Sequence, residues 1–305
     1  MTDALRYPRL RLGTAPDSWG VWFADDPQQV EWPRYLDEAQ AAGYRWTELG
    51  PYGYLPTDPA RLRDELAARS LTLTGGTVVA ALHRGPAALV DAKAACAAEA
   101  ATLTPLGARH LVILPEGYTD ADHGLSQPAT LTDDQWRALN DGMTELGRFV
   151  RDELDCVLVF HSHADTHVGA PDELERFLAG TDGEVVKLCL DTGHIAYCGG
   201  DPLQVIRDHG DRVEYVHLKS VDPAVRERVH AEGLDFGAAV KLGAMVEPQL
   251  GEPDMPPVLA ALAALDRDLF CVVEQDLYPC LPEMPLPIAT RTFAYYGERG
   301  LRVRP

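Results

Sequence analysis

The sequence lacks the patterns that mark secretion, membrane insertion and disulfide cross-linking. Its first eleven residues carry three arginines but no apolar run that would serve as a signal peptide, and no later stretch approaches the length of a transmembrane helix. The six cysteines are scattered along the chain without a C-x-x-C pair. We therefore expect a cytoplasmic protein with reduced, mostly structural thiols and no membrane partner.

Basic side chains are scarce relative to acidic ones. The 305 residues include 27 lysines and arginines against 47 aspartates and glutamates, which gives a formal net charge of -20. A surface of this charge repels phosphate backbones and anionic lipids. The composition therefore argues against nucleic acid as a partner and leaves a small molecule as the expected one.

Several familiar nucleotide and metal motifs are also missing. No G-x-G-x-x-G follows the first apolar segment, and no G-x-x-x-x-G-K phosphate loop or H-E-x-x-H helix motif occurs. An open, doubly wound nucleotide-binding sheet is thus the weaker of the two parallel-sheet architectures. A metal site, if there is one, must be assembled from residues that the fold brings together.

Short apolar segments alternate with stretches of helical periodicity through nearly the whole chain. The stretch from Asp133 to Glu153, for example, carries apolar residues at spacings of three and four. Eight segments read as buried parallel strands: Leu10–Thr14, Trp46–Leu49, Leu71–Thr74, His110–Leu114, Cys156–His161, Val186–Asp191, Val213–Leu218 and Phe270–Glu274. Eight such units predict a single (β/α)8 TIM barrel over residues 1–305, with one irregular insertion from Ser220 to Asp254.

Ionisable residues stand at the ends of the last four predicted strands. In such barrels the working groups lie at the carboxyl ends of the strands, where His161, Asp191, His217 and Glu274 are found. Any one of them could be an ordinary hydrogen-bonded end residue, but together they predict one metal site. Two imidazoles and two carboxylates suit Mn²⁺, Co²⁺, Zn²⁺ or Fe²⁺ better than Ca²⁺ or Mg²⁺, which favour oxygen ligands.

Other polar and aromatic residues lie in or near the loops that follow these strands. Some stand two or three residues beyond a predicted ligand, within reach of a substrate, and the aromatic ones offer either walls for a cyclic polyol or simple packing at the rim. The residues concerned are Asp17, Ser18, Trp19, Trp22, Glu48, Tyr52, Tyr54, His163, His194 and Lys219.

Four segments resemble the myo-inosose dehydratase branch of the xylose isomerase-like barrels. They are Gly13 to Gly20, Glu48 to Pro56, Asp191 to His194, and His217 to Lys219, and the likeness extends to about Asp276. The resemblance implies a barrel with a divalent metal held by a glutamate, an aspartate, a histidine and a second glutamate from strands five to eight. Asp191, His217 and Glu274 match this set.

His161 departs from the wider superfamily, which has a glutamate at its position. In the ketose epimerases of the superfamily, two metal-bound glutamates resemble a pair of bases on opposite faces of the substrate. An imidazole bound to metal through one nitrogen cannot serve as both ligand and base, as a carboxylate can. The histidine therefore argues against two-base epimerisation. With two carboxylates the ligand set just balances the charge of the metal and leaves it a stronger Lewis acid.

The resemblance implies a metal-dependent lyase that dehydrates a keto-polyol of the inosose type. The alternatives are a metal-dependent isomerase or epimerase of an unphosphorylated sugar, and a non-catalytic polyol-binding barrel. Mn²⁺ or Co²⁺ is the first expectation for the metal, with Zn²⁺, Fe²⁺ and Mg²⁺ as alternatives. The expected catalytic residues are His163, Lys219 and Glu48, and the expected substrate-binding residues are Asp17, Trp19, Tyr52 and His194. Barrels of this size often form homo-oligomers.

Overall fold

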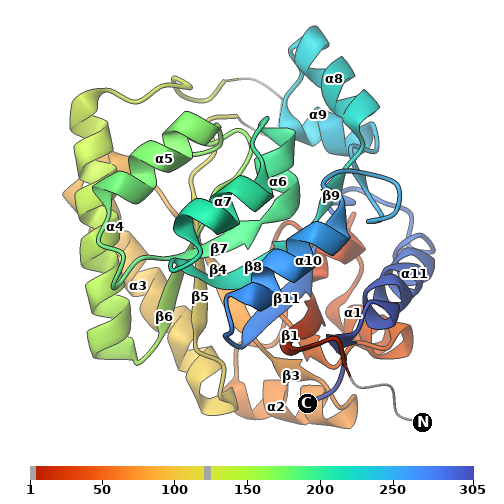
Figure 1. The fold of residues 1–305 in the computed structure, drawn as a ribbon. Coiled ribbons are helices and arrows are strands. Elements are labelled where there is room, and N and C mark those ends of the chain that lie inside the picture. Colours follow the sequence, from red (N-terminus) through yellow and green to blue (C-terminus); the bar gives the residue numbers. More distant parts are fainter. Residues whose placement is uncertain (1–4, 120–124) are drawn as a thin grey trace.

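The protein folds as a ring of parallel strands surrounded by helices (Figure 1), as seen in a computed structural model that describes residues 5–119 and 125–305. The barrel strands are β1 (Tyr7–Thr14), β2 (Trp46–Thr47), β3 (Thr72–Leu73) with β4 (Gly75–Ala80), β5 (His110–Pro115), β6 (Val157–His161), β7 (Lys187–Asp191), β8 (Val213–Leu218) and β11 (Leu269–Val273). Neighbours in the ring pair in parallel, and β1 lies between β2 and β11. This is the predicted TIM barrel.

Two short strands, β3 and β4, together form the third strand of the barrel. β3 pairs with β2, and β4 pairs with β5. Between them, the amide of Thr74 donates to the carbonyl of Thr47, and the amide of Leu49 donates to the carbonyl of Gly75. These hydrogen bonds close the ring, because they continue the backbone pairing with the β2 segment from β3 to the start of β4.

Helices cover the outside of the ring. They are α1 (Trp32–Ala42), α2 (Pro59–Ala68), α3 (Pro86–Leu103), α4 (Asp133–Leu154), α5 (Pro171–Gly180), α6 (Thr192–Tyr197), α7 (Pro202–His209), α10 (Met255–Ala264) and α11 (Pro285–Glu298). Proline occupies the first turn of most of them, where its missing N–H costs nothing. Helix α4 begins instead with a capping box between Thr132 and Gln135.

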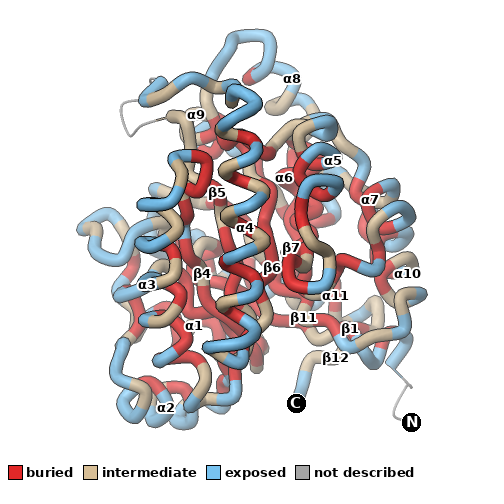
Figure 2. The backbone as a smooth tube through the Cα atoms, turned by 90° about the vertical axis from the view of Figure 1, so that its left-hand side faces the viewer, coloured by how far each residue is buried: buried red, intermediate tan, exposed pale blue. Residues whose placement is uncertain are grey.

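The apolar residues form an outer and an inner core. The larger core fills the space between the strands and the covering helices, whose outer faces are exposed (Figure 2). A smaller cluster fills the barrel interior: Ala15, Val112, Val159, Cys189, Tyr215 and Val272. All six cysteines are free thiols, and four of them are buried. In the part of the chain that the structure describes, no helix is both long and apolar enough to cross a bilayer.

The predicted strands are all present, but the third is longer than the sequence suggested. The prediction ended it at Thr74, but the strand continues as β4 through Gly75 and Gly76, although glycine is usually unfavourable in a strand. Here the glycines allow close packing against β5 and α3. A Cβ added at Gly75 would lie 2.8 Å from the carbonyl oxygen of His110, and one added at Gly76 would clash with the carboxyl group of Glu99.

Glu99, on α3, is a buried carboxyl group that should make stability depend on pH. Its Oε1 atom lacks a hydrogen-bond partner, and burial raises the pKa of Glu99 to about 8. Between pH 4.5 and 8 the folded protein therefore holds a proton that the unfolded chain has released. The contribution of this group to stability is lost progressively as pH rises through that window.

We expect Glu99→Gln to remove this pH dependence, because glutamine does not titrate. Relative to the variant, the wild type should lose up to about 1.4 kcal/mol of unfolding free energy per pH unit between pH 5 and 8. Urea denaturation at several pH values measures the difference, with Glu227→Gln at an exposed position as the control. Parallel stability curves for wild type and Glu99→Gln would contradict the prediction.

The insertion from Ser220 to Asp254 contains regular structure that the sequence did not reveal. Two short antiparallel strands, β9 (Ser220–Val221) and β10 (Met245–Val246), frame the helices α8 (Pro223–Glu232) and α9 (Phe236–Lys241). The two helices stand beyond the carboxyl ends of the barrel strands (Figure 1). A last short strand, β12 (Leu301–Arg302), pairs with β1. The insertion thus covers part of the face on which the predicted site lies.

Candidate active site

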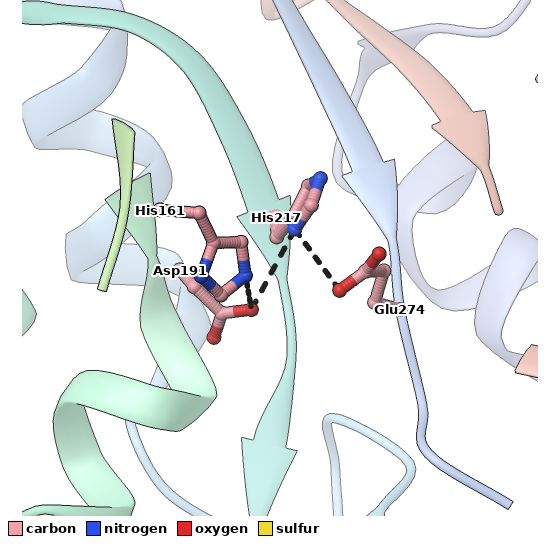
Figure 3. A group of neighbouring side chains, drawn as sticks. All are labelled: His161, Asp191, His217 and Glu274. Carbon is pink, nitrogen blue, oxygen red and sulfur yellow. Dashed lines mark ion pairs between the residues drawn. The ribbon is translucent and has the colours of Figure 1, made fainter. Parts of the chain in front are cut away.

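Four side chains from adjacent strands meet at the carboxyl end of the barrel (Figure 3). His161, Asp191, His217 and Glu274 each offer one ligand atom, and these atoms all lie within 4.8 Å of one another. Asp191 Oδ2 lies 3.2 Å from His161 Nε2, and His217 Nδ1 lies 2.9 Å from Glu274 Oε2. The strand ends thus bring together the whole set that the sequence singled out.

The polar atoms of this cluster fit a divalent cation. Asp191 caps α6, and its Oδ1 accepts a hydrogen bond of 2.7 Å from the amide of His194. Its Oδ2, like His217 Nδ1, is buried without a hydrogen-bond partner. Unpaired buried acceptors are costly unless something compensates them. A cation between these atoms would compensate both, and the mixed nitrogen and oxygen donors suit a transition metal.

Glu48, at the end of β2, holds His217 in the orientation that the cluster needs. Its Oε1 lies 2.7 Å from His217 Nε2, on the opposite side of the ring from Asp191 and Glu274. A proton on Nε2 leaves the lone pair of Nδ1 facing the cluster. Burial lowers the pKa of His217, but its neighbours Cys189, Glu274 and Glu48 together raise it well above its usual value, so a bound cation would displace a proton from Nδ1.

Lys219 lies beside the cluster among carboxylates. Its Nζ donates to Asp276 Oδ2 at 2.7 Å and lies 3.1 Å from Glu274 Oε2. Burial lowers the pKa of Lys219, but Asp276 and Glu274 outweigh this effect and raise it well above its usual value. The side chain is therefore an ammonium ion. Asp276 was not predicted, although it follows Glu274 by two residues, as Lys219 follows His217.

His163 faces the same cavity as an uncharged imidazole. Its Nδ1 lies 2.7 Å from the carbonyl oxygen of Ala164, which fixes the proton on Nδ1 and leaves the lone pair on Nε2. Burial lowers the pKa of His163 to about 3, and the charges of His161 and Lys219 act in the same direction. The side chain is thus neutral and has one nitrogen free to accept a proton.

These groups open into a cavity of about 1130 Å³ at the mouth of the barrel. His161, His163, His217, Lys219, Glu48 and Glu274 line it, together with Asp17, Tyr52, Trp22 and Asp276. Burial, followed by the charge of Glu274, raises the pKa of Asp17 well above its usual value. Asp17 and Tyr52, which the sequence predicted to bind substrate, both line this cavity. Trp22 and Asp276 line it as well.

Trp19 and His194 do not reach this cavity. Trp19 is fully buried, its Nε1 donates to Glu38 Oε2 at 2.9 Å, and its ring packs edge-on against Tyr35. His194 is also buried, with its ring centre 3.8 Å from that of His163 and its Nε2 3.1 Å from Lys219 Nζ. Their contact with substrate therefore stays a prediction: in this structure Trp19 packs in the core, and His194 contacts His163 and Lys219.

The sequence matches the model of one protein family, the xylose isomerase-like TIM barrels, over residues 36–287. The chain belongs to this family. It is also 30% identical to the inosose dehydratase of Lacticaseibacillus casei over 279 residues, which are 88% of this chain and 91% of the relative. The resemblance found in the sequence is confirmed, and the protein is an enzyme.

Solved structures of other proteins share the fold at low sequence identity. A probable 3-DHS dehydratase, AsbF of Bacillus anthracis, superposes with a TM-score of 0.70 at 14% identity, over 95% of this chain and all (100%) of that one. The IolI protein, solved with a bound zinc atom, gives a TM-score of 0.70 at 15% identity, over 95% of this chain and 99% of that one. Both confirm the barrel fold of this family member.

Proposed function

We propose that this enzyme is a metal-dependent lyase that removes water from a keto-polyol of the inosose type. One observation carries the proposal: a neutral His163 and the ammonium group of Lys219 line one cavity together with three of the four residues of the metal cluster, His161, His217 and Glu274. A base and an acid beside a Lewis-acid site are what an elimination next to a ketone requires. The inosose dehydratase relative supports this substrate class.

His161, Asp191, His217 and Glu274 would hold the metal, for which we propose Mn²⁺ or Co²⁺ ahead of Zn²⁺, Fe²⁺ or Mg²⁺. A bound divalent cation would supply Lewis-acid polarisation of the ketone, which acidifies the neighbouring C–H bond. The protein keeps the ligands oriented, because Glu48 fixes the ring of His217 and the amide of His194 fixes Asp191. We therefore assign Glu48 to positioning.

In this proposal His163 and Lys219 move the protons. His163 Nε2 accepts the hydrogen from the carbon next to the ketone, and the C–H electrons form a carbon–carbon double bond. As that double bond forms toward the β-carbon, the bond from the β-carbon to its hydroxyl breaks, and the electron pair of that bond stays on the oxygen, which Lys219 protonates so that water leaves. Hydroxide alone is a poor leaving group, so the departing oxygen needs the proton that the ammonium group of Lys219 supplies. Asp276 accepts a hydrogen bond from this ammonium group.

The cavity wall favours an uncharged polyol. Asp17 and Asp276 line it with carboxyl groups that can hydrogen-bond hydroxyls, and Trp22 and Tyr52 provide aromatic walls. The protein also carries a formal net charge of -20, which disfavours a phosphorylated substrate. An unphosphorylated ring with several hydroxyls is therefore the substrate class that we propose.

The test is turnover of scyllo-inosose by protein reconstituted with Mn²⁺ or Co²⁺. We expect ultraviolet absorbance to grow as a conjugated product forms, and mass spectrometry to show the loss of one water molecule. A product of unchanged mass would instead identify an isomerase or epimerase. Metal binding without any turnover would refute the proposed reaction.

A further inference from the structure

The cavity is larger than a single polyol ring needs. Its volume of about 1130 Å³ exceeds the range of about 300–1,000 Å³ that is typical of pockets for drug-sized ligands. Its lining continues from the metal cluster to a second region, formed by the segments that follow β1 and β11. We call this region the outer lobe, and it comprises Phe23, Asp25, Asp26, Gln28, Tyr278 and Pro279.

A row of aromatic rings connects the metal cluster to the outer lobe. Trp22 Nε1 donates to Asp276 Oδ1 at 3.0 Å, and Asp276 also binds Lys219 beside the cluster. The ring of Tyr278 stacks on Trp22 at a centre distance of 5.1 Å, and Phe23 meets Tyr278 edge-on at 5.3 Å. A ligand that extends from the metal cluster along this row would contact Trp22, Tyr278 and Phe23 in turn.

Phe23 is held in an exposed position by its own loop. The side chain of Gln29 accepts hydrogen bonds from the amides of Trp22 and Phe23, at 2.6 and 2.7 Å, and donates to the carbonyl of Phe23 at 2.9 Å. Phe23 nevertheless remains 46% exposed. A rigid loop that presents an aromatic ring at the rim of a cavity lowers the entropy cost of binding a ligand there.

Carboxylates accompany these rings. Asp26 Oδ2 accepts a hydrogen bond of 3.2 Å from the hydroxyl of Tyr278, and Asp25 lines the same lobe. Carboxylates accept hydrogen bonds from hydroxyl groups and repel anions. Aromatic rings bury the C–H faces of a sugar. The combination matches a neutral pyranose ring.

We propose that the outer lobe binds a neutral glycosyl group carried by the keto-polyol, so that the preferred substrate is a glycosylated keto-polyol. This inference rests on the proposed function for the position of the keto-polyol ring at the metal cluster. Phe23 and Tyr278 are the specificity-determining residues for the added sugar. They do not contact the ring that reacts.

The proposal is tested by calorimetric binding of myo-inositol and of galactosyl-myo-inositol to the Mn²⁺-loaded protein. We expect the glycoside to bind about ten-fold more tightly, as one additional stacked sugar ring would give. Phe23→Ala should abolish this preference while leaving the affinity for myo-inositol unchanged, and Phe23→Tyr, which keeps the ring, should retain it.

Equal affinities for the two ligands, or no binding of the glycoside, would overturn the proposal. So would an equal loss of both affinities in Phe23→Ala, because Phe23 would then contact the shared ring. Turnover of scyllo-inosose is measured separately. If the protein prefers the glycoside but does not turn over scyllo-inosose, the proposed glycosyl site is supported and the proposed reaction is refuted. If the protein turns over scyllo-inosose but does not prefer the glycoside, the proposed reaction is supported and the proposed glycosyl site is refuted.

Discussion

Asp191→Asn should lower the affinity for a divalent metal by about a hundred-fold or more and remove most of the activity. The substitution takes one of two negative charges from the cluster and replaces Oδ2, a buried acceptor without a hydrogen-bond partner. Losing several kcal/mol of transition-state stabilisation from the metal corresponds to a drop in kcat/KM of at least about a hundred-fold. Metal analysis after dialysis and steady-state kinetics measure the two effects.

The fold should survive this change, because asparagine caps a helix about as well as aspartate does. A matched control is Asp201→Asn, since Asp201 caps α7 in the same way but is exposed and lies outside the cavity. The control should keep metal and activity. If Asp191→Asn retains full metal occupancy at the wild-type affinity, the assignment of the ligand set is wrong.

His163→Gln should lower kcat by about a hundred- to ten-thousand-fold, the usual contribution of a general base. The metal content should not change, since His163 is not part of the four-residue cluster. Glutamine retains a polar side chain of similar reach but replaces the imidazole Nε2 by an amide, whose nitrogen has no available lone pair to take a carbon-bound proton. The measurement is turnover of scyllo-inosose by enzyme of equal metal content.

A second readout separates the base from the acid. When substrate is incubated in deuterated water, wild-type enzyme should exchange the hydrogen next to the ketone, and His163→Gln should not. Exchange that continues in the variant while water loss stops would show that His163 is the acid instead. His209→Gln, at a surface ion pair with Glu175, is the control and should behave as wild type.

The sequence alone was sufficient to locate the carboxyl ends of the last four barrel strands and the ionisable residues there. An apolar run that stops at a histidine or carboxylate is informative in a parallel barrel, because every strand end faces the same side. His161, Asp191, His217 and Glu274 could therefore be grouped although more than a hundred residues separate the first from the last.

The loops were harder to interpret, because loop residues have no periodicity that fixes their direction. Trp19 follows β1 in a polar segment and looked like a rim residue, yet the 3₁₀ turn Pro16–Trp19 directs it into the core. The turn closes at Gly20, whose φ of 72° is left-handed. Phe236 is another case: it belongs to the irregular insertion, but it lines the cavity and packs against His163.

The sequence by itself determined the barrel, the four side chains of the cluster and the acidic character that disfavours anionic partners, because these follow from periodicity, strand ends and composition. The tertiary structure alone decided what each polar atom does. It showed that Glu48 contacts Nε2 of His217, that Asp276 accepts a hydrogen bond from Lys219, and that the carbonyl of Ala164 binds Nδ1 of His163. These contacts exist only in the folded chain. Orientation and protonation depend on neighbours in space, which a linear pattern does not contain.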